Sequence, residues 1–374
     1  MNVTIIGWFG EKNIGDDLIL NSIHERVVET INPKHVYVAS NKKTEGYNWI
    51  YDHDFSLKSW IKLFVRGNIV RNLKSLYSSD VIIFCIGGGL SDWNKEVMQR
   101  VIKKIQFYKY ANKRIFFIGV GAGPFVGNFH GHILHKELRK IEKILVRDNT
   151  SLTNLNKLEL KNVSKTNDIV FENNYLNSFF ETNKSEIKMR NQVSIIPVPL
   201  FYNSLWKENE RKFKEYISTF NDMLRYLNTV YEVVKIIPFQ KEFDEKYLIK
   251  HLDSDINFEI FKYEEYEQVY KEMICSKLII PMRFHGLVLS TIFEVPSIPV
   301  IYDHKLYDLS EELNLENICL DLGDGGNWRD HVFTINEFIE SHNKITSRYE
   351  ETKIVYRKYK IQANKNTIFL KGLM

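Results

Sequence analysis

Cysteine is scarce in this sequence, with three residues among 374. Cys85, Cys275 and Cys319 lie far apart and match neither a disulfide framework nor the spacing of a metal site, so a reducing compartment is expected. Apolar runs of the roughly 20 residues that a membrane-spanning helix needs are absent. The first residues, MNVTIIGWFG, also lack the basic and apolar regions of a secretory signal. We therefore expect a cytoplasmic protein without a transmembrane helix.

An excess of charge of one sign is equally absent, because 51 Lys and Arg residues are balanced by 47 Asp and Glu residues. A dedicated nucleic-acid-binding protein would have a concentrated basic face, so we expect no nucleic-acid partner. Glycine and proline are modest, at 18 and 8 residues, and 44% of the chain is apolar. This composition is typical of a globular protein rather than a fibre or a disordered chain. A length of 374 residues predicts two domains.

Short apolar runs alternate with helical patterns along both halves of the chain. Such runs are typical of parallel strands that are covered by helices on both faces. Their repeated alternation with helices predicts an α/β fold with doubly wound parallel sheets. The expected strands are residues 3–7, 35–40, 80–89, 114–123 and 143–148 in the first half, and 192–198, 231–239, 276–282 and 297–303 in the second.

A polar, asparagine-rich stretch interrupts this alternation in the middle of the chain. We therefore predict an N-terminal Rossmann-like domain over residues 1–175, a linker over 176–191 and a C-terminal Rossmann-like domain over 192–341. The remaining segment, 342–374, is helical in pattern, and one path for it is a return to the first domain. Ligands of open α/β sheets bind beyond the carboxyl ends of the strands, so the expected site is a cleft across which the two domains face each other.

Three expected strands of the first domain end in glycine-rich segments, at residues 7–17, 87–89 and 119–123. Glycine lets the backbone approach a ligand closely, and the N-terminus of a following helix attracts anions. Three such ends on one sheet favour a surface on which a ligand lies, with Gly88, Gly89 and Gly121 as candidate contacts. The first segment lacks the G-x-G-x-x-G spacing of a dinucleotide site.

Asn13, Asp16 and Asp17 are polar groups of the first glycine-rich segment. At the mouth of the sheet they are placed to contact a substrate, and the carboxylate of Asp16 can accept a proton from it. The alternative is structural, because an aspartate just before a helix commonly caps it. Both interpretations remain open for Asp16 and Asp17.

The most specific pattern lies in the second half, where the strand ending at Pro281 runs into MRFHG and a helix follows at once. A guanidinium from Arg283 offers a planar fork to a carboxylate or phosphate, and the imidazole of His285 can pass a proton near neutral pH. Their i, i+2 spacing puts both side chains on one side if the segment stays extended. The next strand delivers Tyr302 and Lys305 to the same rim, which predicts a pocket for a small, multiply charged anion. A surface ion-pair cluster is the alternative.

Together these segments resemble the polysaccharide pyruvyltransferase family over about residues 3–316. The matching residues of the first half are Asn13, Gly15 and Asp16, the glycines at 87–89, the 119–124 segment that ends in Pro124, and then Arg147, Asp148, Ser151 and Asp168. Those of the second half are Pro238, Phe239, Asp244, Arg283, His285, Pro296, Tyr302 and Lys305. The block from Arg283 to Lys305 is the specific part of the resemblance.

The resemblance implies two domains in a GT-B-like arrangement, phosphoenolpyruvate as the donor and a pyruvate ketal on a sugar as the product. It also implies that Arg283 and His285 bind the donor and take part in catalysis, with Asp16 as a further candidate. No cofactor besides the co-substrate phosphoenolpyruvate and no metal is expected, because cationic side chains can take the charge of the reaction. The expected donor contacts are Arg283, His285, Lys305, Tyr302, Gly88, Gly89 and Gly121, and the expected acceptor contacts are Asn13, Asp16 and Asp17.

A basic stretch at residues 56–77 contains five Lys or Arg residues and no acidic residue, together with aromatic and aliphatic side chains. Such a stretch can bind an anionic membrane surface, which would suit a sugar acceptor on a polyprenyl carrier at the inner face of the plasma membrane. The alternative is a helix that packs on the sheet and exposes a solvated basic face.

Other interpretations of the chain remain. His130, His132 and His135 cluster, but their spacing is not that of a common zinc motif, so we expect surface histidines rather than a metal site. A glycosyltransferase of the same outline, with a nucleotide-sugar donor, is the main alternative function. A non-catalytic protein that binds an anion or a sugar in the same cleft is the second.

Overall fold

We describe the protein from a computed structural model. The structure describes residues 1–53, 59, 61, 64, 69–91, 95–123, 125, 128–202, 210–323 and 331–372. The chain divides into two compact units. The first unit is Met1–Asn174 with Ala363–Met374, and the second is Tyr175–Gln362.

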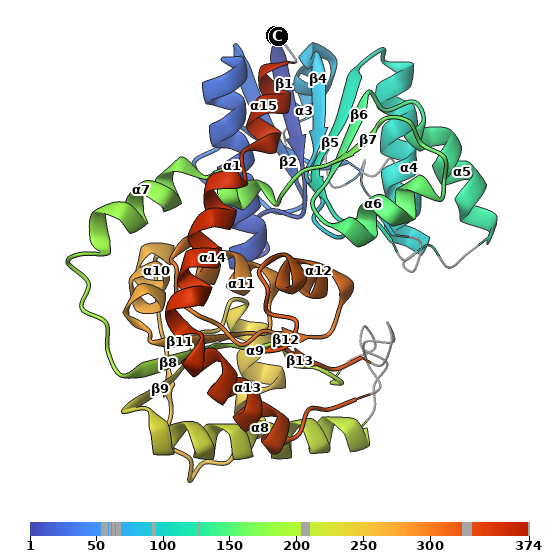
Figure 1. Cartoon of the computed structure of the whole chain (residues 1–374). Coiled ribbons are helices and arrows are strands. Elements are labelled where there is room, and N and C mark those ends of the chain that lie inside the picture. Colours follow the sequence, from blue (N-terminus) through green and yellow to red (C-terminus); the bar gives the residue numbers. More distant parts are fainter. Residues whose placement is uncertain are drawn as a thin grey trace. The chain divides into compact units, whose positions relative to one another are not determined.

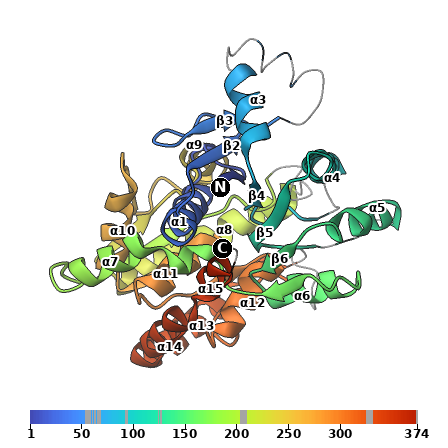
Figure 2. The same ribbon diagram turned by 90° about the horizontal axis from the view of Figure 1, so that it is seen from above.

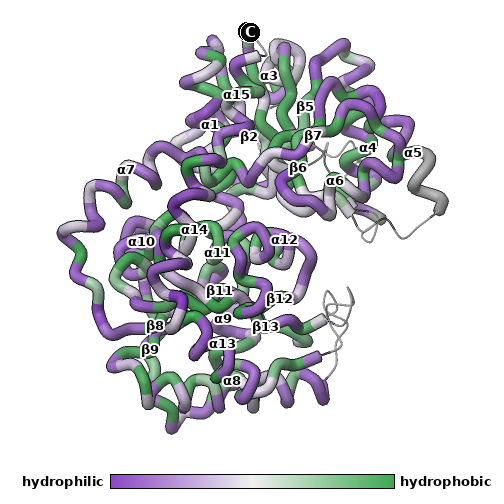
Figure 3. Tube along the Cα trace, in the orientation of Figure 1, coloured by the Kyte–Doolittle hydropathy of each residue, from purple (hydrophilic) through white to green (hydrophobic). Residues whose placement is uncertain are grey.

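The first unit is built on a seven-stranded sheet of order β3-β2-β1-β4-β5-β6-β7, in which every neighbouring pair is parallel (Figure 1). β1 pairs with β2 on one side and with β4 on the other, so that Val3 lies opposite both Val36 and Val81. The hydropathy of the central strands is high along their length (Figure 3). The strands are β1 (Asn2–Ile6), β2 (His35–Ser40), β3 (Trp49–Tyr51), β4 (Val81–Phe84), β5 (Arg114–Val120), β6 (Lys143–Val146) and β7 (Val163–Lys165).

Helices cover both faces of this sheet, with α1 and α15 on one face and α3 and α4 on the other (Figure 2). This arrangement explains why β4 is buried at every residue. Phe84 of β4 stacks on Phe117 of β5 at a centroid distance of 4.6 Å, in the core beneath α4. The helices are α1 (Ile14–Ile31), α3 (Ile69–Ser78), α4 (Lys95–Tyr110), α5 (Asn128–Leu138), α6 (Asn149–Asn156), the 3-10 helix η1 (Ile169–Glu172) and α15 (Lys365–Lys371).

The C-terminal helix α15 belongs to the first unit although the whole second unit precedes it in sequence. Glu172 at the end of η1 accepts hydrogen bonds from the backbone N–H groups of Asn366 (2.8 Å) and Thr367 (2.7 Å). A carboxylate at this position pairs with the first free N–H groups of the helix and with its positive end. The carboxylate of η1 therefore holds α15 in place as a helix cap supplied from elsewhere in the chain.

The second unit contains a four-stranded parallel sheet of order β10-β9-β8-β11 and a two-stranded parallel pair, β12 and β13. A parallel bridge between Ile279 and Ser297 leads from β11 toward β12. The strands are β8 (Gln192–Ile196), β9 (Val233–Ile236), β10 (Glu259–Ile260), β11 (Leu278–Pro281), β12 (Val300–Ile301) and β13 (Leu320–Asp321). The helices are α7 (Asn174–Asn183), α8 (Glu210–Val230), α9 (Lys241–Tyr247), the 3-10 helix η3 (Ile249–His251), α10 (Tyr266–Cys275), α11 (Phe284–Ile292), α12 (His304–Glu312), α13 (Ile335–Ser347) and α14 (Tyr349–Gln362).

The structure confirms the expected α/β class with parallel sheets and differs from the expected boundaries in two places. The range 176–191, expected to be a linker, begins inside helix α7, whose buried residues are Leu176 and Phe180. Leu176, Phe179 and Phe180 are spaced compatibly with this helix, but the asparagine-rich composition around them favours a linker when the sequence is considered alone. The expected C-terminal segment, 342–374, is divided, because the chain up to Gln362 belongs to the second unit and only Ala363–Met374 to the first. Within the described ranges, no helix combines the length and hydropathy needed to cross a bilayer.

Candidate active site

Arg283 occupies the connection between β11 and α11 in the second unit. β11 ends at Pro281, and Arg283 is the N-cap residue of α11 with an extended backbone. Gly286 in the first turn permits close packing here, because a Cβ at this position would lie 3.0 Å from Ile196 and 3.1 Å from Pro281. The tight strand-to-helix turn therefore places the guanidinium at the carboxyl end of the sheet.

Two groups of the second unit fix the guanidinium of Arg283. Its Nε donates a hydrogen bond to the carbonyl oxygen of Pro197 at 3.0 Å, and a terminal nitrogen forms an ion pair with the carboxylate of Asp244. Asp244 is fully buried, and its second oxygen accepts a hydrogen bond from the backbone N–H of Gln240 at 3.0 Å. Burial raises the pKa of Asp244, against the opposing effects of Arg283 and of the backbone donors. The side chain of Arg283 is 15% exposed, so it reaches the surface. Its ion pair with the fully buried Asp244 holds it in this position.

His285 follows Arg283 but lies inside the helix rather than on an extended segment. α11 begins at Phe284, so the expectation that Arg283 and His285 share one side through an i, i+2 strand spacing is wrong. Successive residues of a helix turn by about 100°, and the direction of His285 is set by the first turn of α11 instead. The half-buried imidazole packs edge-on against the ring of Phe284, at a centroid distance of 5.2 Å.

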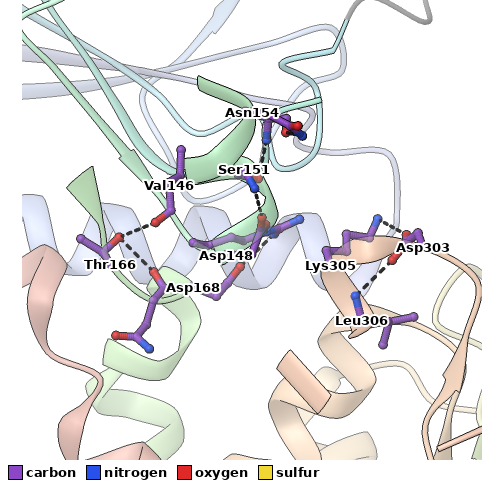
Figure 4. Close-up of polar contacts among 12 residues, drawn as sticks. Val146, Asp148, Ser151, Asn154, Thr166, Asp168, Asp303, Lys305 and Leu306 are labelled. Carbon is purple, nitrogen blue, oxygen red and sulfur yellow. Dashed lines mark hydrogen bonds and ion pairs between the residues drawn. The ribbon is translucent and has the colours of Figure 1, made fainter. Parts of the chain in front are cut away.

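Tyr302 and Lys305 follow β12, the next strand of the same unit. Asp303 caps α12 by accepting a hydrogen bond from the backbone N–H of Leu306 at 3.1 Å, and its other oxygen lies 2.9 Å from the ammonium of Lys305 (Figure 4). The Lys305 side chain is partly exposed, whereas Tyr302 is buried. The ammonium is therefore held at the N-terminus of α12 by the carboxylate that caps this helix.

Tyr216 of α8 shows that Arg283, Asp244 and Tyr302 share one environment. Burial raises the pKa of Tyr216, electrostatic interactions with Asp244 and Tyr302 raise it further, and Arg283 opposes them. The hydroxyl of Tyr216 donates a hydrogen bond to the carbonyl oxygen of Val198 at 2.9 Å, close to the loop that also binds Arg283. Arg283, Asp244 and Tyr302 therefore all lie within electrostatic range of Tyr216. Tyr216 and the supporting role of Asp244 were not predicted.

In the first unit, Asn13 is the N-cap residue of α1, which corrects the assignment of this role to Asp16 or Asp17. Its side-chain oxygen accepts a hydrogen bond from the N–H of Gly15 at 3.1 Å. Its amide nitrogen donates to the carboxylate of Asp16 at 2.9 Å, and Asp17 accepts from the N–H of Gly10 at 3.4 Å. Asp16 and Asp17 are thus first-turn acids, which the positive end of the helix favours.

The glycine-rich segments after β4 and β5 pack against each other. The N–H of Gly121 donates to the carbonyl oxygen of Gly87 at 2.6 Å, and a Cβ on Gly121 would lie 3.3 Å from the Cα of Gly88. A Cβ on Gly89 would meet the carbonyl oxygen of Ile86 at 2.9 Å. Close backbone packing within the protein therefore accounts for Gly89 and Gly121. At Gly88, in contrast, no described atom lies within 4 Å of an added Cβ, so this position is open.

Contacts of Arg147, Asp148, Ser151 and Asp168 join the ends of three strands. Arg147 forms an ion pair with Asp168 at 2.9 Å, and both side chains are almost fully buried. Asp148 caps α6 through the N–H of Ser151 at 2.7 Å (Figure 4). The hydroxyl of Ser151 accepts a hydrogen bond from the N–H of Ala122 at 2.7 Å, which ties α6 to the end of β5.

The expected donor contacts at Arg283, His285, Tyr302 and Lys305 thus belong to the second unit, and the other candidates belong to the first. The side chains of His130 and His132 lie outside the described residues. Across the described part of the chain, no group of three or more His, Cys, Asp or Glu residues is arranged to bind a metal ion.

A sequence model of the family described as "Polysaccharide pyruvyl transferase" matches residues 13–304. This range contains Asn13, Arg283 and His285 and ends just before Lys305. No curated protein sequence matches the chain.

Solved structures with a similar fold include UDP-N-acetylglucosamine 2-epimerase from Rickettsia bellii, with a TM-score of 0.56, 12% identity, and 99% of this chain and 98% of that chain covered. The UDP-GlcNAc 2-epimerase from Neisseria meningitidis, bound to UDP-GlcNAc, has a TM-score of 0.58 at 12% identity, with 100% and 99% covered. The wall teichoic acid polymerase TagF has a TM-score of 0.52 at 10% identity, with 100% and 87% covered. At these identities the similarity establishes a GT-B-like fold alone.

Proposed function

Because the chain belongs to the polysaccharide pyruvyl transferase family, we propose that it transfers a pyruvyl group from phosphoenolpyruvate to a pair of sugar hydroxyls. The product is a pyruvate ketal on a bacterial surface polysaccharide or on its lipid-linked precursor. The observation that carries the proposal is the guanidinium of Arg283, which Pro197 and the buried Asp244 hold at the carboxyl end of β11.

Phosphoenolpyruvate carries a carboxylate and a phosphate, so its binding requires several positive groups. Arg283 offers a planar fork to either anion. The N–H groups at the start of α11 and the ammonium of Lys305 add positive potential at the ends of the neighbouring strands β11 and β12. Arg283 and Lys305 each pair with a carboxylate, so we propose that their remaining N–H donors and the N–H groups of α11 bind the anions of the donor. We propose phosphoenolpyruvate as co-substrate without a further cofactor.

The reaction balances because the two sugar hydroxyls lose two protons, of which one is replaced on the methylene carbon of the donor and the other on the departing phosphate. A proton is added to the methylene carbon of phosphoenolpyruvate, the central carbon gains oxocarbenium character, and a sugar hydroxyl attacks it. The bond to the phosphate oxygen breaks and phosphate leaves, after which a second hydroxyl closes the ketal ring. His285 is the proposed acid that assists phosphate departure, and Asp16 is the proposed base for a sugar hydroxyl. Arg283 stabilises the negative charge of the leaving phosphate.

A ligand screen by thermal unfolding tests the donor. We expect phosphoenolpyruvate, at about 100 times its Kd, to raise Tm by about 5 °C or more, because a ligand that binds only the folded state stabilises it. The control is 2-phosphoglycerate, which has the same two anionic groups without the enol double bond and should stabilise the protein less. Stabilisation by UDP-GlcNAc but not by phosphoenolpyruvate would instead support the nucleotide-sugar glycosyltransferase.

Contact with an anionic membrane surface through residues 56–77 is a further part of this proposal. Lys58, Lys62 and Arg66 lie outside the described residues. In α3, the polar side chains of Asn72 and Ser75 are buried, whereas Val70 is 80% exposed and Tyr77 is 66% exposed. Asn72 faces inward because its side-chain oxygen accepts a hydrogen bond from the N–H of Tyr51 at 2.7 Å. Exposed apolar groups within a basic stretch suit a peripheral contact at the inner face of the plasma membrane.

Sedimentation with vesicles tests this contact. We expect the protein to sediment with vesicles that contain phosphatidylglycerol, and the Val70→Ser, Tyr77→Ser double variant to lose most of this binding because it removes exposed apolar area. Lys62→Glu with Arg66→Glu should have a similar effect. Ile361→Ser is the matched control, since Ile361 is 70% exposed in α14, outside the basic stretch. Equal binding by all variants would refute the membrane contact.

A further inference from the structure

The sheet of the first unit changes its direction of growth at β1. From β1 the sheet extends through β2 to β3 on one side, and through β4 to β7 on the other. At such a point the connections leave the carboxyl ends of two neighbouring strands in opposite directions, which opens a crevice suited to a ligand. A pocket lies at this position, lined by Trp8 after β1, Ile86 after β4 and residues of α4.

One wall of the pocket is apolar and aromatic. Phe84, Ile86 and Val101 contribute buried apolar surface, and the partly buried indole of Trp8 lies among them. The position of this indole depends on Gly89, because a Cβ there would lie 3.1 Å from its Nε1 atom. The glycine-rich segment after β4 thus makes room for the indole of Trp8, a flat ring with an apolar face and a polar edge.

Another part of the lining is polar. Lys104 of α4 forms an ion pair with Asp52, which follows β3, and their side chains are only 10% and 11% exposed. A carboxylate accepts hydrogen bonds and an ammonium donates them, so the pair can bind a hydroxyl group in both roles. Because the two charges compensate each other, this part of the pocket does not favour a polyanion. Asn41 and Arg100 line the pocket at more exposed positions.

An apolar ring face together with fixed donors and acceptors matches the chemistry of a sugar, which has C–H groups on its faces and hydroxyls around its edge. We infer that this pocket binds one sugar ring, with the indole of Trp8 against a ring face and the Asp52–Lys104 pair at the hydroxyls. The inference rests on the proposed function in one respect, namely that this ring belongs to the acceptor. It assigns acceptor recognition to residues that follow β1 and β3 and to α4, beyond Asn13, Asp16 and Asp17.

Saturation-transfer NMR with free glycosides tests the pocket without the donor. The probes are the methyl glycosides of glucose, galactose and mannose at tens of millimolar. We expect a signal from at least one probe, at least a fivefold loss in Trp8→Ala and partial recovery in Trp8→Phe, which keeps an aromatic ring. Tyr110→Ala is the matched control. Tyr110 is an aromatic residue at the end of α4, the helix that lines the pocket, but it is 94% exposed and is not itself a lining residue.

Lys104→Met tests the polar side in the same assay, with the exposed neighbour Lys103→Met as its control. Circular dichroism and Tm establish that each variant is folded. If Lys104→Met fails to fold, the Trp8 variants decide the outcome alone. The absence of signal from all three glycosides, or an unchanged signal in Trp8→Ala, overturns the inference.

The donor assay keeps the two proposals distinguishable. Glycoside binding without any stabilisation by phosphoenolpyruvate would support the pocket and contradict the proposed reaction. Stabilisation by phosphoenolpyruvate with glycoside binding that does not depend on Trp8 would support the donor and contradict the pocket.

Discussion

Replacement of Arg283 by Lys is expected to lower phosphoenolpyruvate-dependent phosphate release by about 100-fold or more, although it keeps the positive charge. An ammonium cannot reproduce the planar fork that donates to Pro197 and pairs with Asp244 while its outer edge remains at the surface. The measurement is steady-state phosphate release with phosphoenolpyruvate and a lipid-linked sugar acceptor. Loss of the fork should raise KM for phosphoenolpyruvate, and kcat should fall with it because the leaving phosphate is less stabilised.

Arg225→Lys is the matched control for this substitution. Arg225 also pairs with an aspartate of the second unit, Asp253, at 2.6 Å, but both side chains are 46% exposed. Its replacement should leave phosphate release unchanged, because exposed ion pairs contribute little. Asp244→Asn keeps the shape of the buried side chain but removes its ion pair with Arg283. It therefore measures how much this ion pair contributes to phosphate release. Phosphate release that survives Arg283→Lys and Arg283→Ala at the original rate would contradict the assignment of Arg283 to the donor.

Arg147→Met is expected to destabilise the first unit by about 3–5 kcal/mol, because it leaves the carboxylate of Asp168 buried without its guanidinium partner. The two side chains are 3% and 1% exposed, so water cannot replace the lost contact. In a unit of this size such a loss lowers Tm by roughly 10 °C. Thermal and urea unfolding of the variant measure both quantities.

Arg114→Met provides the control within the same sheet. Arg114 pairs with Glu142 at 3.0 Å, but the side chains are 44% and 36% exposed, so a cost of less than about 1 kcal/mol is expected. The double variant Arg147→Met, Asp168→Asn should recover most of the stability, because it removes the uncompensated charge. Equal costs for the buried and the exposed pair would show that burial of Arg147 and Asp168 does not determine their contribution.

The two sets of variants separate binding from architecture among residues that the family resemblance groups together. Arg283 is anchored and reaches the surface, whereas Arg147 is enclosed with its partner. We therefore expect phosphoenolpyruvate binding to respond to Arg283 and stability to respond to Arg147.

The position of the long strands and of Arg283 could be read from the sequence, because both depend on local pattern. A continuous apolar run followed by a helix start is enough to predict β1, β4, β5, β8 and β11. The short strands β3 (Trp49–Tyr51) and β10 (Glu259–Ile260) were not predicted, because two or three residues form too short a pattern. β12 (Val300–Ile301) was predicted only because it lies within the longer apolar run 297–303. The sequence leaves Asp16 and Asp17 open as helix caps or as substrate contacts, and only the backbone geometry identifies Asn13 as the cap.

What remained hidden from the sequence depends on contacts between distant residues. Asp244 precedes Arg283 by 39 residues, Arg147 precedes Asp168 by 21, and Glu172 caps a helix that starts almost two hundred residues later. The pocket beside Trp8 arises from the order of the strands, in which β1 lies between β2 and β4. The sequence by itself thus determined the class of the sheets, the family and the position of Arg283, since each depends on patterns of residues that are neighbours in the sequence. Which side chains support that arginine, which ion pairs are buried and where a sugar ring fits were decided by the tertiary structure, because burial and pairing exist only once separated segments pack together.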